Sequence, residues 1–237
     1  MKKLIFGLFT GLLLLFTGCM ESDDDYSLGD IWIGFGIVEN ANSYRIKLDD
    51  GNILIPVAWD NYYNSGSGAS DKDKIDTGDR VFINYTVLDE ELDSEGEIEA
   101  YYVKINSVEE VLMKGIIDIT EEIEDSIGND PIIVQEHWVS NNLLNLQLKY
   151  WGYNKTHFIN LVKQPGTLTP ENQPFEFELR HNKNGDDEAV PYVGFVSFKL
   201  DSLVFTGVDS VRFKVKSIDY QGNTIIFEEV FKYSENN

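Results

Sequence analysis

The sequence contains very few of the residues on which most protein chemistry depends. Its 237 residues include one cysteine and three histidines, and 19 basic side chains stand against 41 acidic ones. A single cysteine excludes a disulfide framework and any metal site built from several thiolates. The formal net charge of −22 argues against a nucleic-acid-binding protein, because binding to phosphates requires a basic face. What the chain does contain is 42% hydrophobic residues, enough to form real cores and to exclude disorder of the whole chain.

The longest apolar run is too short to span a membrane. It covers residues 4–16 after Lys2 and Lys3, whereas a span needs about 20 residues. The run ends at Phe16-Thr17-Gly18-Cys19, and the chain then turns polar. This pattern resembles a bacterial lipoprotein signal peptide over residues 1–18, although Phe16 occupies the place of the usual leucine. We therefore expect acylation of Cys19 to anchor the mature chain to a membrane. An ordinary secretory signal is the alternative.

Residues 19–28 are predicted to form an acidic flexible tether. The run Glu21-Ser22-Asp23-Asp24-Asp25 resembles the export tag that sends lipoproteins to the outer face of the outer membrane in Gram-negative gut anaerobes. A plain solvated tether explains the same charges, so the periplasmic face remains the alternative. We expect an outer-membrane lipoprotein that is exposed at the cell surface.

Apolar residues alternate with period two along the segment 29–115, which is typical of β-strands. Gly34 and Gly36 interrupt the first strand and indicate a bulge or a sharp coil in it. Asp50-Gly51 marks a hairpin, and Pro56 favours an edge position for the returning strand. Some five curled strands over this segment predict an OB-type β-barrel.

The alternation restarts at Pro131, so we interpret 116–130 as a linker and 131–237 as a second domain. Seven strand candidates separated by turns predict a β-sandwich of immunoglobulin-like type. In its last hairpin, the expected register places Lys216 opposite Glu228. The predicted fold class is therefore all-β, with an OB-type barrel followed by an immunoglobulin-like β-sandwich.

The sequence shows no pattern typical of a catalytic or metal site. His137, His157 and His181 lie on or beside three separate predicted strands without metal-binding spacing, and we interpret them as structural or exposed. No serine occupies a Gly-x-Ser-x-Gly turn, and acylation of Cys19 leaves no free thiol. A carboxylate pair of the glycosidase type is not excluded by the inventory of acids. We expect no enzyme, no catalytic residue, no metal and no cofactor.

Two surface features are candidates for binding. Seven acids crowd residues 89–99, where a solvated hairpin tip is favoured over a weak Ca²⁺ site or a surface for a basic partner. Aromatic side chains cluster at Tyr150-Trp151-Gly152-Tyr153. Core packing explains most such rings, but exposed rings also bind sugars or peptides. We name Trp151 and Tyr153 as candidate ligand contacts, with a protein or a glycan as partner.

The whole chain resembles the NigD-like lipoproteins of Gram-negative gut anaerobes. The resemblance rests on Cys19 and on the order of four further segments, Thr77–Val81, Tyr102–Ile105, Val196–Leu200 and Val211–Tyr233. It implies an N-terminal OB domain and a C-terminal β-sandwich, and it carries over no catalytic or binding residue. We expect a non-enzymatic surface lipoprotein that binds a protein or glycan. Because the family takes its name from a bacteriocin gene cluster, an immunity or envelope-protective role is the alternative.

Overall fold

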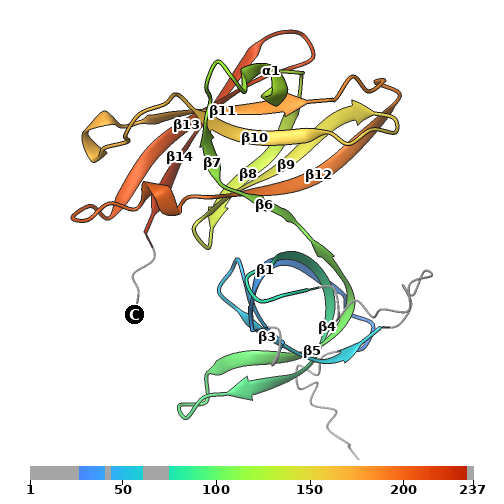
Figure 1. The fold of residues 1–237 in the computed structure, drawn as a ribbon. Coiled ribbons are helices and arrows are strands. Elements are labelled where there is room, and N and C mark those ends of the chain that lie inside the picture. Colours follow the sequence, from blue (N-terminus) through green and yellow to red (C-terminus); the bar gives the residue numbers. More distant parts are fainter. Residues whose placement is uncertain (1–26, 41–43, 61–74, 234–237) are drawn as a thin grey trace, which may run out of the picture.

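The computed structural model describes residues 27–40, 44–60 and 75–233, which form two all-β domains in succession (Figure 1). The signal peptide, Cys19 and most of the predicted tether lie outside the described residues. In the described part of the chain, no helix combines the length and the apolar character that a membrane span requires.

The predicted OB-type barrel is confirmed. Its strands are β1 (Trp32–Asn40), β2 (Arg45–Leu48), β3 (Ile53–Trp59), β4 (Arg80–Leu92) and β5 (Ile98–Glu110). They close in the order β1-β2-β3-β5-β4, with β3 and β5 paired in parallel and the other neighbours antiparallel. The barrel is filled by aliphatic side chains from all five strands, among them Val38, Ile46, Leu54, Val81, Ile83, Val103 and Ile105.

Gly36 allows β1 to approach β2 closely. A Cβ atom on Gly36 would lie 2.8 Å from Cγ2 of Ile46 and 2.9 Å from the carbonyl oxygen of Lys47, closer than such atoms pack. A glycine at this position is therefore explained by the close approach of the two backbones. The edge position predicted from Pro56 is wrong, because β3 is paired on both sides. The register of β3 against β5 shifts between Pro56 and Ala58, and this irregularity accommodates a residue without an N–H group.

The predicted β-sandwich is confirmed as well, so the fold class stands. Each of the seven strand candidates after Pro131 corresponds to a strand. These are β8 (Ile133–Ser140), β9 (Leu143–Gly152), β10 (Phe158–Lys163), β11 (Phe175–Asn182), β12 (Val190–Lys199), β13 (Ser210–Ile218) and β14 (Thr224–Lys232). One sheet has the order β14-β13-β11-β10-β7 and the other β6-β12-β9-β8. Between them lies a core that includes Leu144, Leu146, Leu161, Phe177, Leu179, Phe198, Phe213 and Phe231.

The end of the segment predicted as barrel, 29–115, and the segment that we interpreted as a linker, 116–130, both contribute to this sandwich. β6 (Leu112–Lys114) pairs in parallel with β12, and β7 (Ile116–Asp118) pairs in parallel with β10 in the opposite sheet. The short helix α1 (Glu124–Ile127) follows, and Ile127 packs against Val162 of β10. The structure therefore places β7 and α1 within 116–130, and the sandwich begins before Pro131 (Figure 1).

The register expected for the last hairpin is wrong by two residues. Glu228 lies opposite Lys214, and Lys216 lies opposite Ile226. The loop begins at Asp219, whose carboxylate accepts hydrogen bonds from the N–H groups of Gln221 and Asn223 at 2.9 and 2.8 Å. This capped loop is longer than the expected turn, and so it changes which residues face each other across the two strands.

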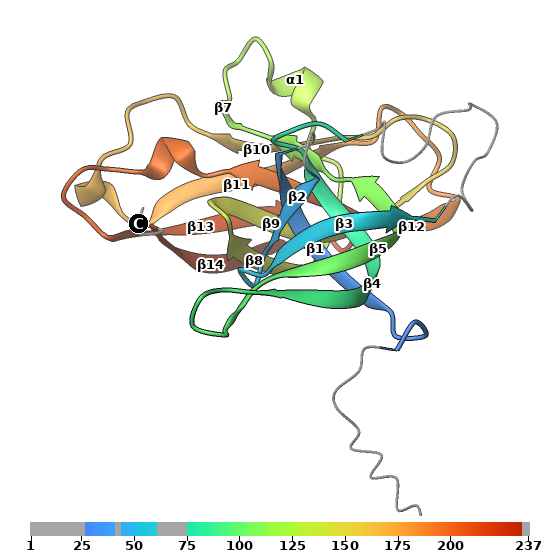
Figure 2. The ribbon, with the colours of Figure 1, turned by 90° about the horizontal axis from the view of Figure 1, so that it is seen from below.

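The four-stranded sheet faces the barrel, and Figure 2 shows the barrel strands in front of the sandwich. The ring centroid of Phe195 in β12 lies 4.8 Å from that of Phe35 and 5.7 Å from that of Phe82. Beside these rings, the Nη atoms of fully buried Arg80 donate to both carboxylate oxygens of Asp49, each at 2.6 Å. Arg80 Nη2 also donates to Asn145 of β9 at 2.9 Å. Residues of both domains thus share one network, which ties the barrel to the sandwich.

Candidate functional site

A cavity of about 200 Å³ lies where β9 ends and β12 begins. We call this cavity the sandwich mouth, and its lining residues are Tyr150, Gly152, Tyr153, Lys155, His157, Asp186 and Tyr192. Tyr150 comes from the four-stranded sheet, and its ring centroid lies 4.8 Å from that of His157, just before β10 of the other sheet. Residues from four separate segments of the chain therefore meet here.

Two histidines form a chain of hydrogen bonds beneath the mouth. His157 Nδ1 lies 2.8 Å from His181 Nε2, and His157 Nε2 lies 3.2 Å from Oδ2 of Asp186. At the other end, His181 Nδ1 lies 2.8 Å from the carbonyl oxygen of Pro131. The side chains of His157 and Asp186 are only 4% and 2% exposed, so the contacts are shielded from water.

The hydrogen-bond partners of His157 and His181 determine how many ring hydrogens the two histidines carry. The Pro131 carbonyl and the Asp186 carboxylate only accept, so His181 Nδ1 and His157 Nε2 each hold a hydrogen. One further hydrogen lies between the two rings. Since two neutral imidazoles hold one ring hydrogen each, the third hydrogen gives the pair one positive charge. Burial lowers the pKa of His181, as does the neighbouring His157, against an opposing effect of the Pro131 carbonyl.

Asp186 balances that charge and holds the adjoining loop. Its carboxylate accepts from the backbone N–H groups of Tyr153 at 2.6 Å and Asn154 at 3.3 Å. Burial alone would raise the pKa of Asp186, but the N–H groups of Tyr153, Asn154 and Lys155 and the contact with His157 lower it well below its usual range. The carboxylate is therefore ionised and fully engaged with the protein.

Gly152 is required by this packing. A Cβ atom at this position would lie 2.9 Å from His157 Nε2 and 3.1 Å from Asp186 Oδ2. The chain passes so close to the His157–Asp186 contact that a side chain would push the two groups apart.

Two tyrosine rings form the outer rim of the mouth. Tyr153 is 60% exposed and Tyr192 is 41% exposed. The Tyr192 hydroxyl donates to the backbone oxygen of Tyr153 at 3.3 Å, and its ring stacks on Tyr150 with a centroid distance of 5.9 Å. Exposed rings held over a buried, hydrogen-bonded floor are suited to contact a ligand.

The structure separates the two aromatic residues that we named from the sequence. Tyr153 lines the mouth, whereas Trp151 does not. The Trp151 ring packs edge-on against Tyr220 at a centroid distance of 4.7 Å, and Lys149 Nζ lies 5.0 Å over it. Because β9 ends at Gly152, the chain turns before Tyr153, and residues that alternation would place on one face point to different places.

Of the three histidines, the sequence reasoning missed that two would meet. His157 and His181 come together because β10 and β11 are antiparallel neighbours, with Ile159 opposite His181. His137 lies elsewhere, stacked on Phe227 and 2.6 Å from Glu229. The contact between the two histidines could have been predicted only from a prediction that β10 pairs with β11. No sequence pattern marked Asp186 or Tyr192 as residues of a site.

The acidic segment 89–99 forms the tip of the β4–β5 hairpin. The Asp93 carboxylate accepts from the N–H groups of Glu95 and Glu97 at 2.8 and 3.0 Å, so it stabilises the turn. Across 27–40, 44–60 and 75–233, no three histidine, cysteine or carboxylate side chains gather in a way that could hold a metal ion.

Two family models match the chain. The model described as the NigD-like N-terminal OB domain matches residues 36–111, and that of the NigD-like C-terminal beta sandwich domain matches residues 115–229. None of the functionally curated proteins that were compared matches the chain.

Several solved structures share the whole two-domain fold. A protein from Parabacteroides distasonis, provisionally named toxin-related, is 29% identical, with a TM-score of 0.68 over 86% of this chain and 95% of that one. A NigD-like immunity protein from Bacteroides caccae is 22% identical, with a TM-score of 0.63 over 86% of this chain and 99% of that one. A protein from Bacteroides fragilis, provisionally named a lipoprotein, is 14% identical, with a TM-score of 0.58 over 88% of this chain and 100% of that one. The last two likenesses concern the fold alone.

Proposed function

The chain belongs to the NigD-like family, and we propose that it is a non-enzymatic binding module whose sandwich mouth contacts a glycan at the cell surface. The observation that carries this proposal is the pair of exposed rings, Tyr153 and Tyr192, above a preformed cavity. At about 200 Å³ the cavity is smaller than the ~300–1,000 Å³ typical of pockets for drug-sized ligands. It suits one small unit, such as a single sugar ring, with the tyrosine rings against its apolar face.

The hydrogen bonds of the floor favour binding over catalysis. All four ring nitrogens of His157 and His181 have partners within the chain or between the two rings, and Asp186 is engaged by backbone N–H groups. A general base must reach the proton that it abstracts, and none of these groups is left open toward the cavity. The arrangement supports a site that holds its shape.

The proposed location follows from the N-terminal sequence. The lipoprotein-type signal is followed by Cys19, eight residues before Ser27, where the described structure begins. Acyl chains on Cys19 would hold the barrel close to the membrane, and the acidic tether supports export to the cell surface. The fold shared with the B. fragilis protein provisionally named a lipoprotein is consistent with this location.

The test is retention of the detergent-solubilised full chain on an array of immobilised glycans. We expect Tyr153→Ala to abolish retention and Trp151→Ala, on the other side of β9, to leave it intact. If no glycan retains the chain, or if the two variants behave alike, the mouth is not the glycan site.

An immunity function is the alternative, because a protein with the same fold is named a NigD-like immunity protein. In that role the chain would protect the envelope by masking a bacteriocin receptor. Deletion of the gene would then increase sensitivity to the bacteriocin, and unchanged sensitivity would reject the alternative.

A further inference from the structure

A second cavity lies where two parallel strands of the five-stranded sheet separate. β11 and β13 are paired from Phe175 and Phe213 as far as Glu178 and Lys216. Beyond this point the segment around Asp130 crosses between them. The backbone N–H of Asp130 donates to the carbonyl oxygen of His181 in β11 at 2.7 Å. The N–H of Ile132 donates to the carbonyl oxygen of Ile218 in β13 at 2.9 Å. The crossing leaves a hollow of about 260 Å³.

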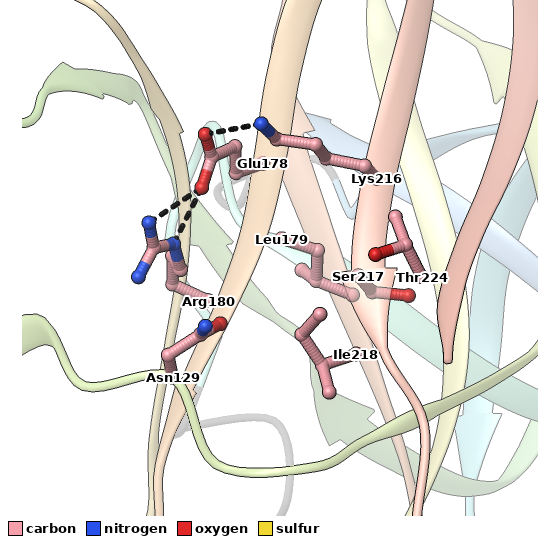
Figure 3. Close-up of a pocket in the computed structure, with 8 residues that line it drawn as sticks. All are labelled: Asn129, Glu178, Leu179, Arg180, Lys216, Ser217, Ile218 and Thr224. Carbon is pink, nitrogen blue, oxygen red and sulfur yellow. Dashed lines mark hydrogen bonds and ion pairs between the residues drawn. The ribbon is translucent and has the colours of Figure 1, made fainter. Parts of the chain in front are cut away.

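We call this hollow the splay pocket, and Figure 3 shows the residues that line it: Asn129, Glu178, Leu179, Arg180, Lys216, Ser217, Ile218 and Thr224. Asn129 and Arg180 stand on one side, and Ser217 and Thr224 stand on the other. The aliphatic side chains of Leu179 and Ile218 lie between them (Figure 3). The pocket therefore combines an apolar floor with polar walls.

The carboxylate of the splay pocket, that of Glu178, is already engaged by two cations. Glu178 Oε2 accepts from Arg180 Nε at 2.7 Å and lies 2.6 Å from Arg180 Nη2, while Glu178 Oε1 lies 2.8 Å from Lys216 Nζ (Figure 3). Burial raises the pKa of Glu178, but its hydrogen bonds with Lys216 and Arg180 lower it more, so the carboxylate is ionised.

The N–H groups of Arg180 and Lys216, in contrast, outnumber the hydrogen bonds that they make to Glu178. A guanidinium has five N–H groups and an ammonium has three. Arg180 directs two toward Glu178, and its Nη1 makes a long contact of 3.5 Å with the Gly128 oxygen. Lys216 directs one hydrogen toward Glu178 and is 47% exposed, so two of its hydrogens are available to a ligand.

The charges in the pocket favour an anion. In a chain of net charge −22, Arg180 and Lys216 place two cations around the single carboxylate of Glu178. Two further acids lie near these cations. Glu176 interacts with Lys216 but is itself paired with Lys214 at 2.9 Å. Glu124 of α1 is 56% exposed and 3.8 Å from Arg180 Nη2. Its interaction is weakened by solvent, whereas Arg180 is only 12% exposed.

We propose that the splay pocket binds the carboxylate of an acidic sugar of the uronate class. The carboxylate would accept from Lys216 and Arg180 without displacing Glu178, because spare donors are present on both cations. The sugar ring would lie over Leu179 and Ile218, and its hydroxyl groups would meet Asn129, Ser217 and Thr224. Since liquid water occupies about 30 Å³ per molecule, a hollow of about 260 Å³ has room for one such unit.

This site is independent of the sandwich mouth. None of its lining residues lines the mouth, so either site can bind or fail to bind without the other.

The experiment is a calorimetric titration of the detergent-solubilised full chain at low ionic strength, with D-glucuronate and, in parallel, with neutral D-glucose. We expect saturable binding of glucuronate and none of glucose. Lys216→Met should weaken the affinity for glucuronate at least tenfold. The matched control is Lys214→Met, because Lys214 lies on the same face of β13 and pairs with Glu176 at 2.9 Å but does not line the pocket.

Two outcomes overturn the proposal: glucuronate shows no saturable binding, or the two lysine variants weaken it equally. A second variant, Thr224→Val, guards against a folding defect, because Thr224 is exposed at the start of β14 and its hydroxyl is replaced by a methyl group of similar size. It should weaken glucuronate binding while the thermal midpoint stays unchanged. Binding that is unaffected by both Lys216→Met and Thr224→Val would place glucuronate elsewhere.

Discussion

Arg80 and Asp49 form a two-point ion pair, with both Nη–oxygen distances 2.6 Å, at the contact between the barrel and the sandwich. Arg80 is fully buried, and Trp138 of β8 donates to the same carboxylate at 2.9 Å. Burial raises the pKa of Asp49, but its hydrogen bonds with Arg80 and Trp138 lower it more, so the pair is ionised.

The first prediction concerns this pair. Asp49→Asn leaves the Arg80 charge buried without its counter-charge, and we expect the free energy of unfolding to fall by about 3–5 kcal/mol. Urea denaturation, followed by tryptophan fluorescence, measures the change. The control is Asp50→Asn, since Asp50 is exposed and accepts hydrogen bonds from the nearby Asn52. Equal losses in the two variants would show that the ion pair has no special role.

The second prediction concerns Gly152. Gly152→Ala forces a Cβ atom against His157 and Asp186, and we expect a loss of about 1–3 kcal/mol, as for other overpacked sites. Gly194→Ala is the matched control, because Gly194 lies in β12 with nothing within 4 Å of an added Cβ. Its stability should stay within about 0.5 kcal/mol of the parent. A Gly152→Ala variant as stable as the Gly194→Ala variant would mean that the mouth is loosely packed.

The third prediction concerns pH. The pKa of His181 is lower in the folded chain than the ordinary histidine value of 6.5, so the unfolded chain takes up the proton first as the pH falls. Stability therefore declines below about pH 6.5, with a slope of at most about 1.4 kcal/mol per pH unit from this group. A second positive charge on the pair of His157 and His181 would also put a hydrogen on both His157 Nδ1 and His181 Nε2. These two nitrogens face each other, and neither could then accept a hydrogen bond from the other.

Denaturation curves between pH 5 and pH 7.5 measure this slope. His181→Asn keeps a donor for the Pro131 carbonyl but cannot titrate, so its curve should be flatter in this range. His137→Asn, which lies outside the mouth, should retain the slope. If His181→Asn follows the parent at every pH, the proton assignment is wrong.

The fourth prediction concerns Cys19. Cys19→Ser cannot be acylated, and we expect the chain to move from the membrane fraction to the soluble fraction of cells. Protease treatment of intact cells should degrade the parent chain if it is exposed at the surface. A parent chain that resists the protease on whole cells but not in lysates would place it on the periplasmic face.

Alternation along the chain predicted the strands well, because strands such as β11 and β13 bury every second side chain. The hairpin β13–β14 illustrates the limit: alternation cannot distinguish Lys216 opposite Glu228 from the observed Lys214 opposite Glu228, since the two registers differ by two residues and bury the same faces. A shift by an even number of residues leaves no trace in the pattern of apolar residues.

The sequence pattern was equally unable to show which strands pair with each other. Pro56 suggested an edge because proline lacks an N–H group, but a local shift of register accommodates it inside the closed barrel. His157 and His181 seemed scattered because their sites are 24 residues apart in the sequence, and only the antiparallel pairing brings them together. The three-residue strands β6 and β7 are too short for alternation to be detected.

β6 and β7 have a practical consequence. Each is the outermost strand of its sheet, on the side where β12 and β10 would otherwise present unpaired backbone groups. A fragment that starts at Pro131 would lack both and would expose two adjacent edges, which invite other chains to add strands. Such a fragment should aggregate, whereas one that starts at Val111 should stay monomeric. The two short strands that follow the barrel in the sequence thus cover one edge of each sheet of the sandwich.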